Sequence, residues 1–443
     1  MKKMKRVLVL GAGLVAKPLV HYLLEQPEFR VICASRTVSK AVALVGGHER
    51  GEAKKLDLTD PKALPALVPD SDLVISMVPY TFHVQVAELC IAHKKTFVST
   101  SYVSAAMKAL DAKARAAGVM LLNEIGLDPG IDHMSAMRVF TDVRSRGGKI
   151  KSFMSYCGGL PAPEANDNPF GYKFSWSPRG VLLAGKNSAK YLKDGKVREI
   201  PSEGLFLDRW SLRGVPGAGD FEAYPNRDSI EYIDIYDLKY ADTVFRATLR
   251  NPGWCETLKC IVDLGVLDTE ERDLGGLTYG GMVDRLAPGD GDRRARVAKK
   301  LGVAAGSAAM KNIEWLGLFG EEPLPLAKGG YIDVMTHRML EKMSYAKGER
   351  DMIVLHHEFL GAFEGGKKER ITSTLVDFGI PKGDSAMSRT VGYPAAIAAR
   401  FLLEGKIKGS GVHIPVAPEI YNPVLDELER LGIECVEKTE TIG

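Results

Sequence analysis

A glycine-rich segment near the N-terminus carries the clearest chemical pattern in the chain. Gly11, Ala12, Gly13, Leu14 and Val15 follow a short apolar run and precede a segment with helical apolar spacing. The spacing is that of the G-x-G-x-x-G/A fingerprint, whose glycines let the backbone turn and approach a pyrophosphate while the helix N-terminus supplies N–H donors. The segment therefore predicts a dinucleotide-binding turn, and a strand-to-helix turn without a ligand is the alternative.

The residues that end the next predicted strand indicate which dinucleotide binds. An NAD site usually has Asp or Glu here to bind the ribose hydroxyls. This chain has Ser35, Arg36 and Thr37 instead, with Lys40 as a second positive charge nearby. Arg36 could pair with a 2′-phosphate, and Ser35 and Thr37 could donate hydrogen bonds to it. The pattern favours NADP(H), and a solvated arginine in a loop is the alternative for Arg36.

Two further strands should end beside the same ligand, because ligands of open parallel sheets bind outside the carboxyl ends of the strands. We expect Val78 and Pro79 to contact the cofactor. Ser101 and Tyr102 should lie where the nicotinamide ends and a substrate begins, although Tyr102 could also be a packing aromatic. We also expect Thr100 and Leu127 to contact the cofactor.

The elements that position these residues alternate between strand and helix over about the first 125 residues, which is typical of a parallel sheet with crossover helices. The predicted strands are Arg6–Leu10, Arg30–Ser35, Lys54–Leu58, Leu73–Val78, Thr96–Ser99 and Val119–Asn123. The helices between them include Val15–Leu24, Phe82–His93 and Ala105–Ala117. Strand number and order match a Rossmann domain.

The pattern changes after Leu127. Longer predicted strands with fewer helices follow at Ile150–Cys157, Ser229–Leu238 and Thr243–Arg250, and a hairpin pairs Asp351–Phe359 with Lys368–Asp377. A helix is predicted at Pro394–Leu403. The predicted fold is α/β: a Rossmann parallel-sheet domain plus a mixed α/β substrate domain with a helical insertion. The predicted domains are 1–127 with a returning segment 385–443, then 128–253 with 351–384, and the helical domain 254–350.

Composition narrows the class of protein. A formal net charge of +3 over 443 residues does not favour nucleic-acid binding, and no apolar stretch approaches the length of a membrane helix. The six cysteines form no CxxC pair, so we expect a cytoplasmic protein without disulfides. No metal site is predicted, because the nearest candidate, His356-His357-Glu358, places neighbouring side chains on opposite faces of a strand.

Long and unusual strings connect the chain to a known family. The segment Gly126–Met134 reads GLDPGIDHM, and the segment Ser155–Glu164 reads SYCGGLPAPE. Both resemble the corresponding strings of the glutamate-forming saccharopine dehydrogenases, also called saccharopine reductases. Three shorter matches lie at Asn168-Pro169, Tyr172–Pro178 and Tyr224–Ser229. The resemblance runs from the first strand to at least Arg250 and continues more loosely beyond it.

The resemblance implies a Rossmann domain, a mixed substrate domain and a helical domain. It also implies the reversible reaction of saccharopine, NADP⁺ and water to glutamate, 2-aminoadipate semialdehyde and NADPH. Family members that use NAD carry an acidic residue where this chain has Arg36, which supports NADP. NADPH dependence favours saccharopine synthesis in a route to lysine, and lysine degradation stays open as the alternative. A homodimer is expected from the habit of the family.

The family's substrate contacts carry over to a small set of residues in this chain. They are Ser101, Tyr102, Asp128, Arg227, Thr248, Leu249 and Arg250. Saccharopine carries three carboxylates, and the planar fork of arginine binds a carboxylate through two hydrogen bonds. We therefore expect Arg227 and Arg250 to hold carboxylates. A surface salt bridge is the alternative for Arg227, and a solvated charge is the alternative for Arg250.

The chemistry also needs a group that gives and takes protons, because an ammonium must be deprotonated and water must add to an imine. Asp128, Tyr102 and Cys157 are the candidates. Asp128 could anchor the amine, act as the base, or simply cap its loop before Pro129. Cys157 could equally be a buried inert thiol. His133 is not expected to be catalytic: it could orient Asp132 or cap the following helix.

Two other functions remain open on the sequence. A carboxyspermidine or carboxynorspermidine dehydrogenase also couples an amine to an aldehyde, but its polyamine substrate predicts acidic pocket residues rather than Arg227 and Arg250. A non-catalytic protein that senses NADP would need only the first domain and would leave the matching substrate segments unexplained.

Overall fold

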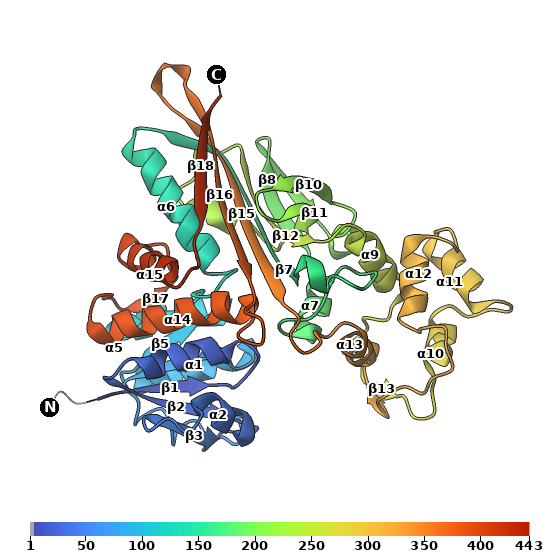
Figure 1. The fold of residues 1–443 in the computed structure, drawn as a ribbon, viewed down its shortest axis with the longest axis horizontal. Coiled ribbons are helices and arrows are strands. Elements are labelled where there is room, and N and C mark those ends of the chain that lie inside the picture. The colour runs from blue at the N-terminus through green and yellow to red at the C-terminus, as the bar shows by residue number, and fades with distance from the viewer. Residues whose placement is uncertain (1–3, 443) are drawn as a thin grey trace. The chain divides into compact units, whose positions relative to one another are not determined.

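A computed structural model describes residues 4–442 of the chain (Figure 1). The chain forms two compact units. Unit 1 comprises residues 4–148 and Gly383–Val436, and unit 2 comprises Lys149–Lys382 with 437–442. No helix within residues 4–442 is long and apolar enough to cross a membrane.

Unit 1 is built on a seven-stranded sheet in the order β17-β6-β5-β4-β1-β2-β3. Every neighbouring pair in it is parallel. The strands are β1 (Lys5–Leu10), β2 (Phe29–Ser35), β3 (Gly51–Lys55), β4 (Leu73–Ser76), β5 (Thr96–Ser99), β6 (Met120–Leu122) and β17 (Gly411–His413). The six N-terminal strands have the Rossmann order. β17 comes from the C-terminal segment and pairs with β6.

Helices pack on this sheet because each buries an apolar face. They are α1 (Ala16–Glu25), α2 (Val38–Val45), α3 (His83–Ala92), α4 (Ala105–Lys108), α5 (Asp111–Ala117), α6 (Ile131–Ser145), α14 (Ala386–Glu404) and α15 (Pro418–Arg430), with a 3₁₀ turn η1 (Tyr80–Phe82). Figure 1 shows α1 and α14 side by side, although they are distant in sequence. The predicted helix Ala105–Ala117 is in fact two helices, which are interrupted at Ala109 and Leu110.

The boundary between the units falls later than the predicted domain boundary at residue 127. Helix α6 belongs to unit 1 because it packs against α15, where Arg138 forms ion pairs with Asp426 and Glu429. The Thr141 hydroxyl also hydrogen-bonds to the Tyr421 hydroxyl at 2.8 Å. Residues 254–350 lie within unit 2, so a separate helical domain there stays a prediction.

Unit 2 is built on a nine-stranded mixed sheet in the order β10-β11-β12-β7-β15-β16-β18, with β8 pairing with β12 and β9. β7 and β12 run parallel. The strands are β7 (Lys149–Pro161), β8 (Ala189–Lys193), β9 (Lys196–Ile200), β10 (Trp210–Val215), β11 (Gly219–Pro225), β12 (Thr243–Arg250), β15 (Asp351–Ala362), β16 (Lys368–Phe378) and β18 (Val436–Thr441). The predicted hairpin is β15 and β16, and it turns through Gly365 and Gly366.

The remaining elements of unit 2 are mostly helices. Most of these helices share one apolar cluster, in which Trp254, Ile261 and Met282 are almost fully buried. They are α7 (Pro178–Ala184), α8 (Glu231–Ile235), α9 (Trp254–Leu264), α10 (Tyr279–Leu286), α11 (Arg293–Leu301), α12 (Ala308–Trp315) and α13 (Tyr331–Lys342), with the 3₁₀ turns η2 (Pro163–Ala165), η3 (Ser202–Gly204) and η4 (Glu364–Gly366) and the short pair β13 (Arg272–Asp273) and β14 (Lys328–Gly329). The predicted fold class is confirmed.

Two strand predictions differ from the structure. The predicted strand Lys54–Leu58 is displaced, because β3 spans Gly51–Lys55. The second difference is larger. Ser229–Leu238 was expected to be extended because it is rich in Ile and Tyr, which favour strands. Helix α8 occupies its centre instead. Tyr232 and Tyr236 are four residues apart, and their rings stack at 5.2 Å with both side chains buried. Residues at this spacing meet on one face of a helix, so packing decided the structure over local propensity.

A close approach of two strands in unit 2 gives a test of this packing. A Cβ added at Gly158 on β7 would lie 2.7 Å from the Leu249 carbonyl oxygen on β12. We predict that Gly158→Ala destabilises unit 2 by about 1–3 kcal/mol because the strands must separate. This corresponds to a fall of about 2–10 °C in Tm by scanning calorimetry. Gly204→Ala is the matched control, since its Cβ would meet nothing closer than 3.5 Å. An equal shift for both variants would contradict the packing argument.

Candidate functional site

The glycine-rich turn of unit 1 has the geometry that a pyrophosphate requires. Gly11 has a φ of +111°, and a Cβ there would lie 2.7 Å from the Met77 carbonyl oxygen, so only glycine fits. A Cβ at Gly13 would meet nothing within 4 Å, which leaves open space over that backbone. Helix α1 begins at Ala16 without a side chain capping its N-terminus. The Ala16 amide donates to the Gly13 carbonyl and Pro18 has no N–H, so the amides that can face an anion are those of the turn itself and of Lys17. These residues fit a dinucleotide.

The residues expected to recognise the 2′-phosphate lie at the end of β2. Ser35 is half-buried, and Arg36, Thr37 and Lys40 are exposed. Arg36 makes no hydrogen bond or ion pair of its own with any side chain in residues 4–442. Hydrogen bonds from Thr59 hold the pKa of the exposed Asp57 below its usual value, and Lys55 and Arg36 act in the same direction. The guanidinium of Arg36 is thus available to a phosphate.

The ends of β4 and β5 place the other predicted cofactor residues. Val78, Thr100 and Ser101 are half-buried, Pro79 is exposed, and the Leu127 side chain is buried. Val78 and Pro79 follow β4, Thr100 and Ser101 follow β5, and Leu127 lies in the loop after β6. All of them therefore lie at the carboxyl ends of the parallel strands of unit 1. The site also contains residues for which the sequence suggested no role.

Glu124 is one of these additional residues, and its partner is His133, for which the sequence suggested only a role beside Asp132 or as a helix cap. Glu124 has a φ of +57°, which is uncommon for a residue with a side chain. Its carboxylate accepts a hydrogen bond from the Val103 amide at 2.8 Å and contacts His133 Nε2 at 2.8 Å, with both side chains buried. Its backbone amide donates to the Ser101 carbonyl. Glu124 therefore holds the segment 101–103, and nothing in the local sequence pattern indicated this.

Tyr102 and Asp128 form the one pair of proposed proton-transfer groups that meet within unit 1. The Tyr102 hydroxyl donates to Asp128 Oδ1 at 2.7 Å, and both side chains are half-buried. The loop that carries Asp128 is tight: Gly130 has a φ of +148°, and a Cβ there would lie 2.0 Å from the Gly126 carbonyl oxygen. The two glycines of the GLDPG string thus constrain the backbone so that Asp128 lies within hydrogen-bond distance of the Tyr102 hydroxyl.

In unit 2 the predicted arginines differ in their surroundings. Arg227 is exposed in the loop after β11, and its φ is +58°. Arg250 ends β12 and is only 6% exposed. Its Nη1 donates to the Leu249 carbonyl at 2.7 Å, whereas its Nε has no hydrogen-bond partner among the described residues. No carboxylate within residues 4–442 forms an ion pair with Arg250, so its positive charge is buried without an anion.

Aromatic rings and not carboxylates surround this guanidinium. Its carbon lies 4.8 Å from the centroid of the Tyr172 ring and 5.3 Å from that of the Trp254 ring. The Tyr172 hydroxyl and Trp254 Nε1 are also buried without a partner in the described chain. Glu222 pairs with Arg250 in the β11–β12 register, but its carboxylate accepts the Cys255 amide at 2.6 Å. A buried cation with unpaired donors beside it is suited to bind a carboxylate.

The other predicted residues of unit 2 lie close to Arg250 in the sheet. Cys157 on β7 pairs with Thr248 on β12 and interacts electrostatically with Arg250. Its side chain is 7% exposed. Thr248 is half-buried, while the Leu249 side chain is fully buried in an apolar cluster, so Leu249 can contact a ligand only through its backbone. Tyr172 lies in a string that carried the family resemblance, but it and Trp254 received no role from the sequence.

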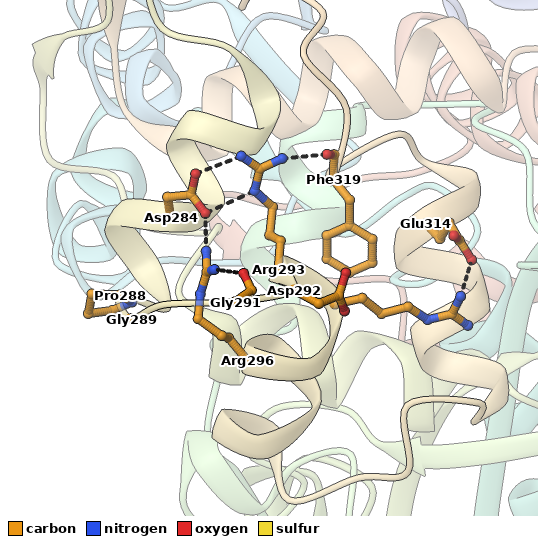
Figure 2. A pocket seen from close by; sticks show the side chains of 10 residues that line it. Asp284, Pro288, Gly289, Gly291, Asp292, Arg293, Arg296, Glu314 and Phe319 are labelled. Carbon is orange, nitrogen blue, oxygen red and sulfur yellow. Dashed lines mark hydrogen bonds and ion pairs between the residues drawn. The ribbon is translucent and has the colours of Figure 1, made fainter.

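A surface pocket in the helical part of unit 2 is less suited to bind a ligand. Figure 2 shows Arg293 and Arg296 converging on Asp284, while Arg294 pairs with Glu314. Arg293 also donates to the Phe319 carbonyl at 2.6 Å. Because these arginines already have partners, the pocket offers little unsatisfied charge to a ligand.

These features define a class of protein. A Rossmann unit with a fingerprint turn and an unpaired arginine after its second strand is joined to a mixed-sheet unit with a buried, unpaired cation, which is the organisation of a nicotinamide-dependent oxidoreductase. Residues 7–122 match the saccharopine dehydrogenase NADP binding domain, and residues 126–433 match the saccharopine dehydrogenase C-terminal domain. The chain belongs to the saccharopine dehydrogenase family, and the resemblance and the NADP(H) cofactor inferred from the sequence are confirmed.

Individual relatives align with nearly all of this chain. Saccharopine dehydrogenase (NADP(+), L-glutamate-forming) of Saccharomyces cerevisiae is 43% identical, covering 98% of this chain and 99% of that protein. The Bos taurus mitochondrial alpha-aminoadipic semialdehyde synthase is 38% identical over 97% of this chain, but the chain spans only 47% of that protein. The structure of apo saccharopine dehydrogenase (L-Glu forming) from Saccharomyces cerevisiae superimposes with a TM-score of 0.88 at 42% identity, covering 98% of this chain and all of that one.

The exposed, unpaired Arg36 generates a prediction about cofactor choice. We expect Arg36→Ala to weaken NADPH binding by about 10- to 100-fold, because a charge-assisted hydrogen bond to the 2′-phosphate is lost. NADH binding should change by less than about threefold. Titration of nicotinamide fluorescence measures both dissociation constants. Arg430→Ala, which removes an exposed arginine of α15, is the charge-matched control. Equal weakening of both cofactors by Arg36→Ala would remove the role assigned to this residue.

Proposed function

We propose that this chain is a saccharopine dehydrogenase of the NADP⁺-dependent, L-glutamate-forming type. It interconverts saccharopine, NADP⁺ and water with L-glutamate, 2-aminoadipate semialdehyde and NADPH. The observation that carries the proposal is the Arg250 guanidinium, which is buried without a carboxylate and is therefore prepared for a substrate that carries one. Saccharopine carries three carboxylates, and full-length relatives of this chain bear the name of this enzyme.

Substrate binding in this proposal depends mainly on Arg250 and its aromatic neighbours in unit 2. Arg250 binds one carboxylate, and the rings of Tyr172 and Trp254 keep its planar group in a fixed orientation. Arg227 is exposed and supplies a second positive charge for a carboxylate. Thr248 and Leu249 precede Arg250 on β12, and Leu249 contributes only its backbone. Ser101 and Tyr102 are the proposed substrate contacts of unit 1. Orientation of the substrate amine is the main task of these residues.

The cofactor turn binds NADP(H) through Gly11 to Val15, and Ser35, Arg36, Thr37 and Lys40 recognise its 2′-phosphate. When bound, the oxidised cofactor supplies the acceptor for a hydride from the substrate carbon. The chain's own residues must then move protons. One group must accept the proton of the substrate ammonium, and a group must assist the addition of water to the imine.

We assign this proton transfer to the Tyr102–Asp128 pair. Through the 2.7 Å hydrogen bond, the phenol can pass its proton to the Asp128 carboxylate while it takes a proton from the substrate. Both side chains are half-buried rather than enclosed. Geometry of this kind is the first requirement for a general base. Cys157 is only 7% exposed, and this burial favours the inert thiol over the acid–base thiol.

The reaction itself is tested by following NADPH absorbance with glutamate and 2-aminoadipate semialdehyde, and then with saccharopine and NADP⁺. Consumption that needs both amine and aldehyde, and that prefers NADPH over NADH, supports the proposal. If NADPH binds but no turnover occurs, saccharopine is the wrong substrate, and couplings of polyamines are tested next.

Arg250 generates a prediction that separates function from stability. Arg250→Met replaces a buried, unpaired charge with an apolar chain of similar length, so Tm should stay equal or rise. The kcat/KM for saccharopine should fall by about 100-fold or more, because a charge-paired carboxylate contact is lost. NADPH affinity should stay within about threefold. Calorimetry, steady-state kinetics and fluorescence titration give the three readouts.

Arg246→Met provides the matched control for this experiment. Arg246 is also a buried arginine of β12, but it donates to the Tyr232 hydroxyl at 2.8 Å and stacks on that ring. Its removal should therefore lower Tm. A fall in Tm for Arg250→Met, without a selective loss of saccharopine turnover, would show that Arg250 is structural.

The proton-transfer assignment predicts an order among three variants. Asp128→Asn should lower kcat by about 100-fold or more, because a general base contributes 10²–10⁴ to the rate. Tyr102→Phe should lower kcat less, and Cys157→Ala should lower it by less than about tenfold. Profiles of kcat against pH in the saccharopine-oxidising direction check the assignment: a general base must be deprotonated to act, so the acidic limb of the wild-type profile should change for Asp128→Asn. If Cys157→Ala is the most damaged variant, the assignment passes to the thiol.

Location and assembly form a separate proposal. We propose a cytoplasmic homodimer, supported by the absence of CxxC pairs in the sequence and by the habit of the family.

A further inference from the structure

A histidine without any role so far connects two strand ends of unit 1. His83 is the first residue of α3, and its Nδ1 lies 2.9 Å from the hydroxyl of Ser76, the last residue of β4. Its Nε2 lies 2.8 Å from the hydroxyl of Ser101, which follows β5. The imidazole thus bridges two serine hydroxyls, one fully buried and one half-buried.

The bridge is buried, and this determines the charge of the ring. Ser76 is fully buried and His83 is 5% exposed, with the Phe97 ring against the imidazole at 6.2 Å. Burial lowers the pKa of His83 to about 4, so the imidazole is neutral at neutral pH. A neutral imidazole has one N–H donor and one acceptor nitrogen. One serine must therefore donate to the ring, and the other must accept from it.

Burial of Ser76 decides which serine donates. Its hydroxyl has no hydrogen-bond partner among residues 4–442 other than His83 Nδ1. If Nδ1 carried the proton, the Ser76 hydroxyl hydrogen would be buried without an acceptor, which costs about 1–3 kcal/mol. If Ser76 donates to Nδ1 instead, every group in the pair is satisfied. The imidazole proton then lies on Nε2 and is donated to Ser101 Oγ.

This arrangement leaves the hydrogen of Ser101 uncommitted. The Ser101 oxygen accepts from Nε2 with one lone pair, so the hydroxyl hydrogen must point away from the ring, toward a further acceptor. The backbone of Ser101 is held as well, because its amide donates to Ser99 Oγ at 3.2 Å and its carbonyl accepts from the Glu124 amide. Ser101 is thus a fixed hydroxyl with a directed donor, and its preferred partner is a ligand oxygen.

We propose that His83 is a positioning residue that fixes Ser101 as a hydrogen-bond donor to an oxygen of the bound ligands. The oxygen belongs either to a substrate carboxylate or to the nicotinamide carboxamide. This assignment rests on the proposed function for the identity of the ligands, but the direction of the Ser76–His83–Ser101 bonds does not depend on it.

Two substitutions at His83 separate its two nitrogens. The amide of Gln reaches the place of Nε2 and can still donate to Ser101, whereas Asn reaches only the place of Nδ1. We expect His83→Asn to lower kcat/KM for saccharopine by about tenfold, as for one lost hydrogen bond, and His83→Gln to recover much of it. An effect on KM for saccharopine with unchanged NADPH affinity identifies the carboxylate, and a weaker NADPH affinity identifies the carboxamide. His93→Asn, at an exposed histidine just after α3, is the control.

A double-mutant cycle separates positioning from a purely structural role. If His83 acts through Ser101, His83→Asn should cause no further loss in a Ser101→Ala background. Additive losses, with a fall in Tm and no recovery by His83→Gln, would show that His83 only supports the fold.

The direction of the bonds is tested without any turnover. Spectra of the protein with ¹⁵N-labelled histidine rings show which nitrogen carries the proton, and the resonances of His83 are identified by their loss in His83→Gln. We expect Nε2 to be protonated and Nδ1 to be an acceptor, and we expect Ser76→Ala to shift the ring toward Nδ1–H. A protonated Nδ1 in the wild type would overturn the proposal, whichever ligand the enzyme uses. Lack of saccharopine turnover in a wild type with protonated Nε2 would count against the proposed function alone.

Discussion

The buried charge of Arg250 is the strongest constraint on unit 2. Removing a guanidinium from water costs several kcal/mol even after relaxation of the surroundings. The Leu249 carbonyl and the rings of Tyr172 and Trp254 recover part of this cost, but no carboxylate in the described chain does. Glu222 is opposite Arg250 in the sheet, yet its carboxylate serves the N-terminus of α9. The fold therefore leaves Arg250 without the carboxylate of Glu222 on the neighbouring strand. In the proposed function, a carboxylate of the substrate pairs with Arg250 instead.

Unit 1 meets a different constraint, which topology solves. Parallel strands end at the same edge of a sheet, so loops that are far apart in sequence converge there. Gly11 follows β1, Ser35 ends β2, Val78 follows β4 and Ser101 follows β5. The glycine at position 11 is required because the Met77 backbone passes directly against it. Strand order alone thus explains why the cofactor residues come from four separate segments.

The sequence could predict the features that depend on local patterns, but not those that depend on contacts made in the folded chain. Strand ends and the fingerprint turn depend on local periodicity and glycine spacing, so β1, β5 and the hairpin of β15 and β16 were found nearly to the residue. The segment 229–238 was misassigned because Ile and Tyr favour strands locally, while the stacking of Tyr232 on Tyr236 favours a helix. Glu124, Tyr172, Trp254 and His83 carry no local pattern. Their contacts depend on partners that only the folded chain brings near, so local patterns could not point to them, and the roles of the predicted site residues stay predictions.

The segment that joins β5 to α4 shows what such supporting residues achieve. The Ser101 amide donates to Ser99, and the Ser101 hydroxyl contacts His83. The Tyr102 phenol donates to Asp128, and the Val103 amide donates to Glu124. Glu124 adopts an uncommon φ to do so, and a buried carboxylate and a buried imidazole are both fully engaged. Buried polar groups of this kind rigidify a loop only when every member is paired. In the proposed mechanism this loop presents a hydroxyl and a phenol to the reacting amine. Its rigidity keeps both groups within hydrogen-bond reach while the cofactor exchanges the hydride.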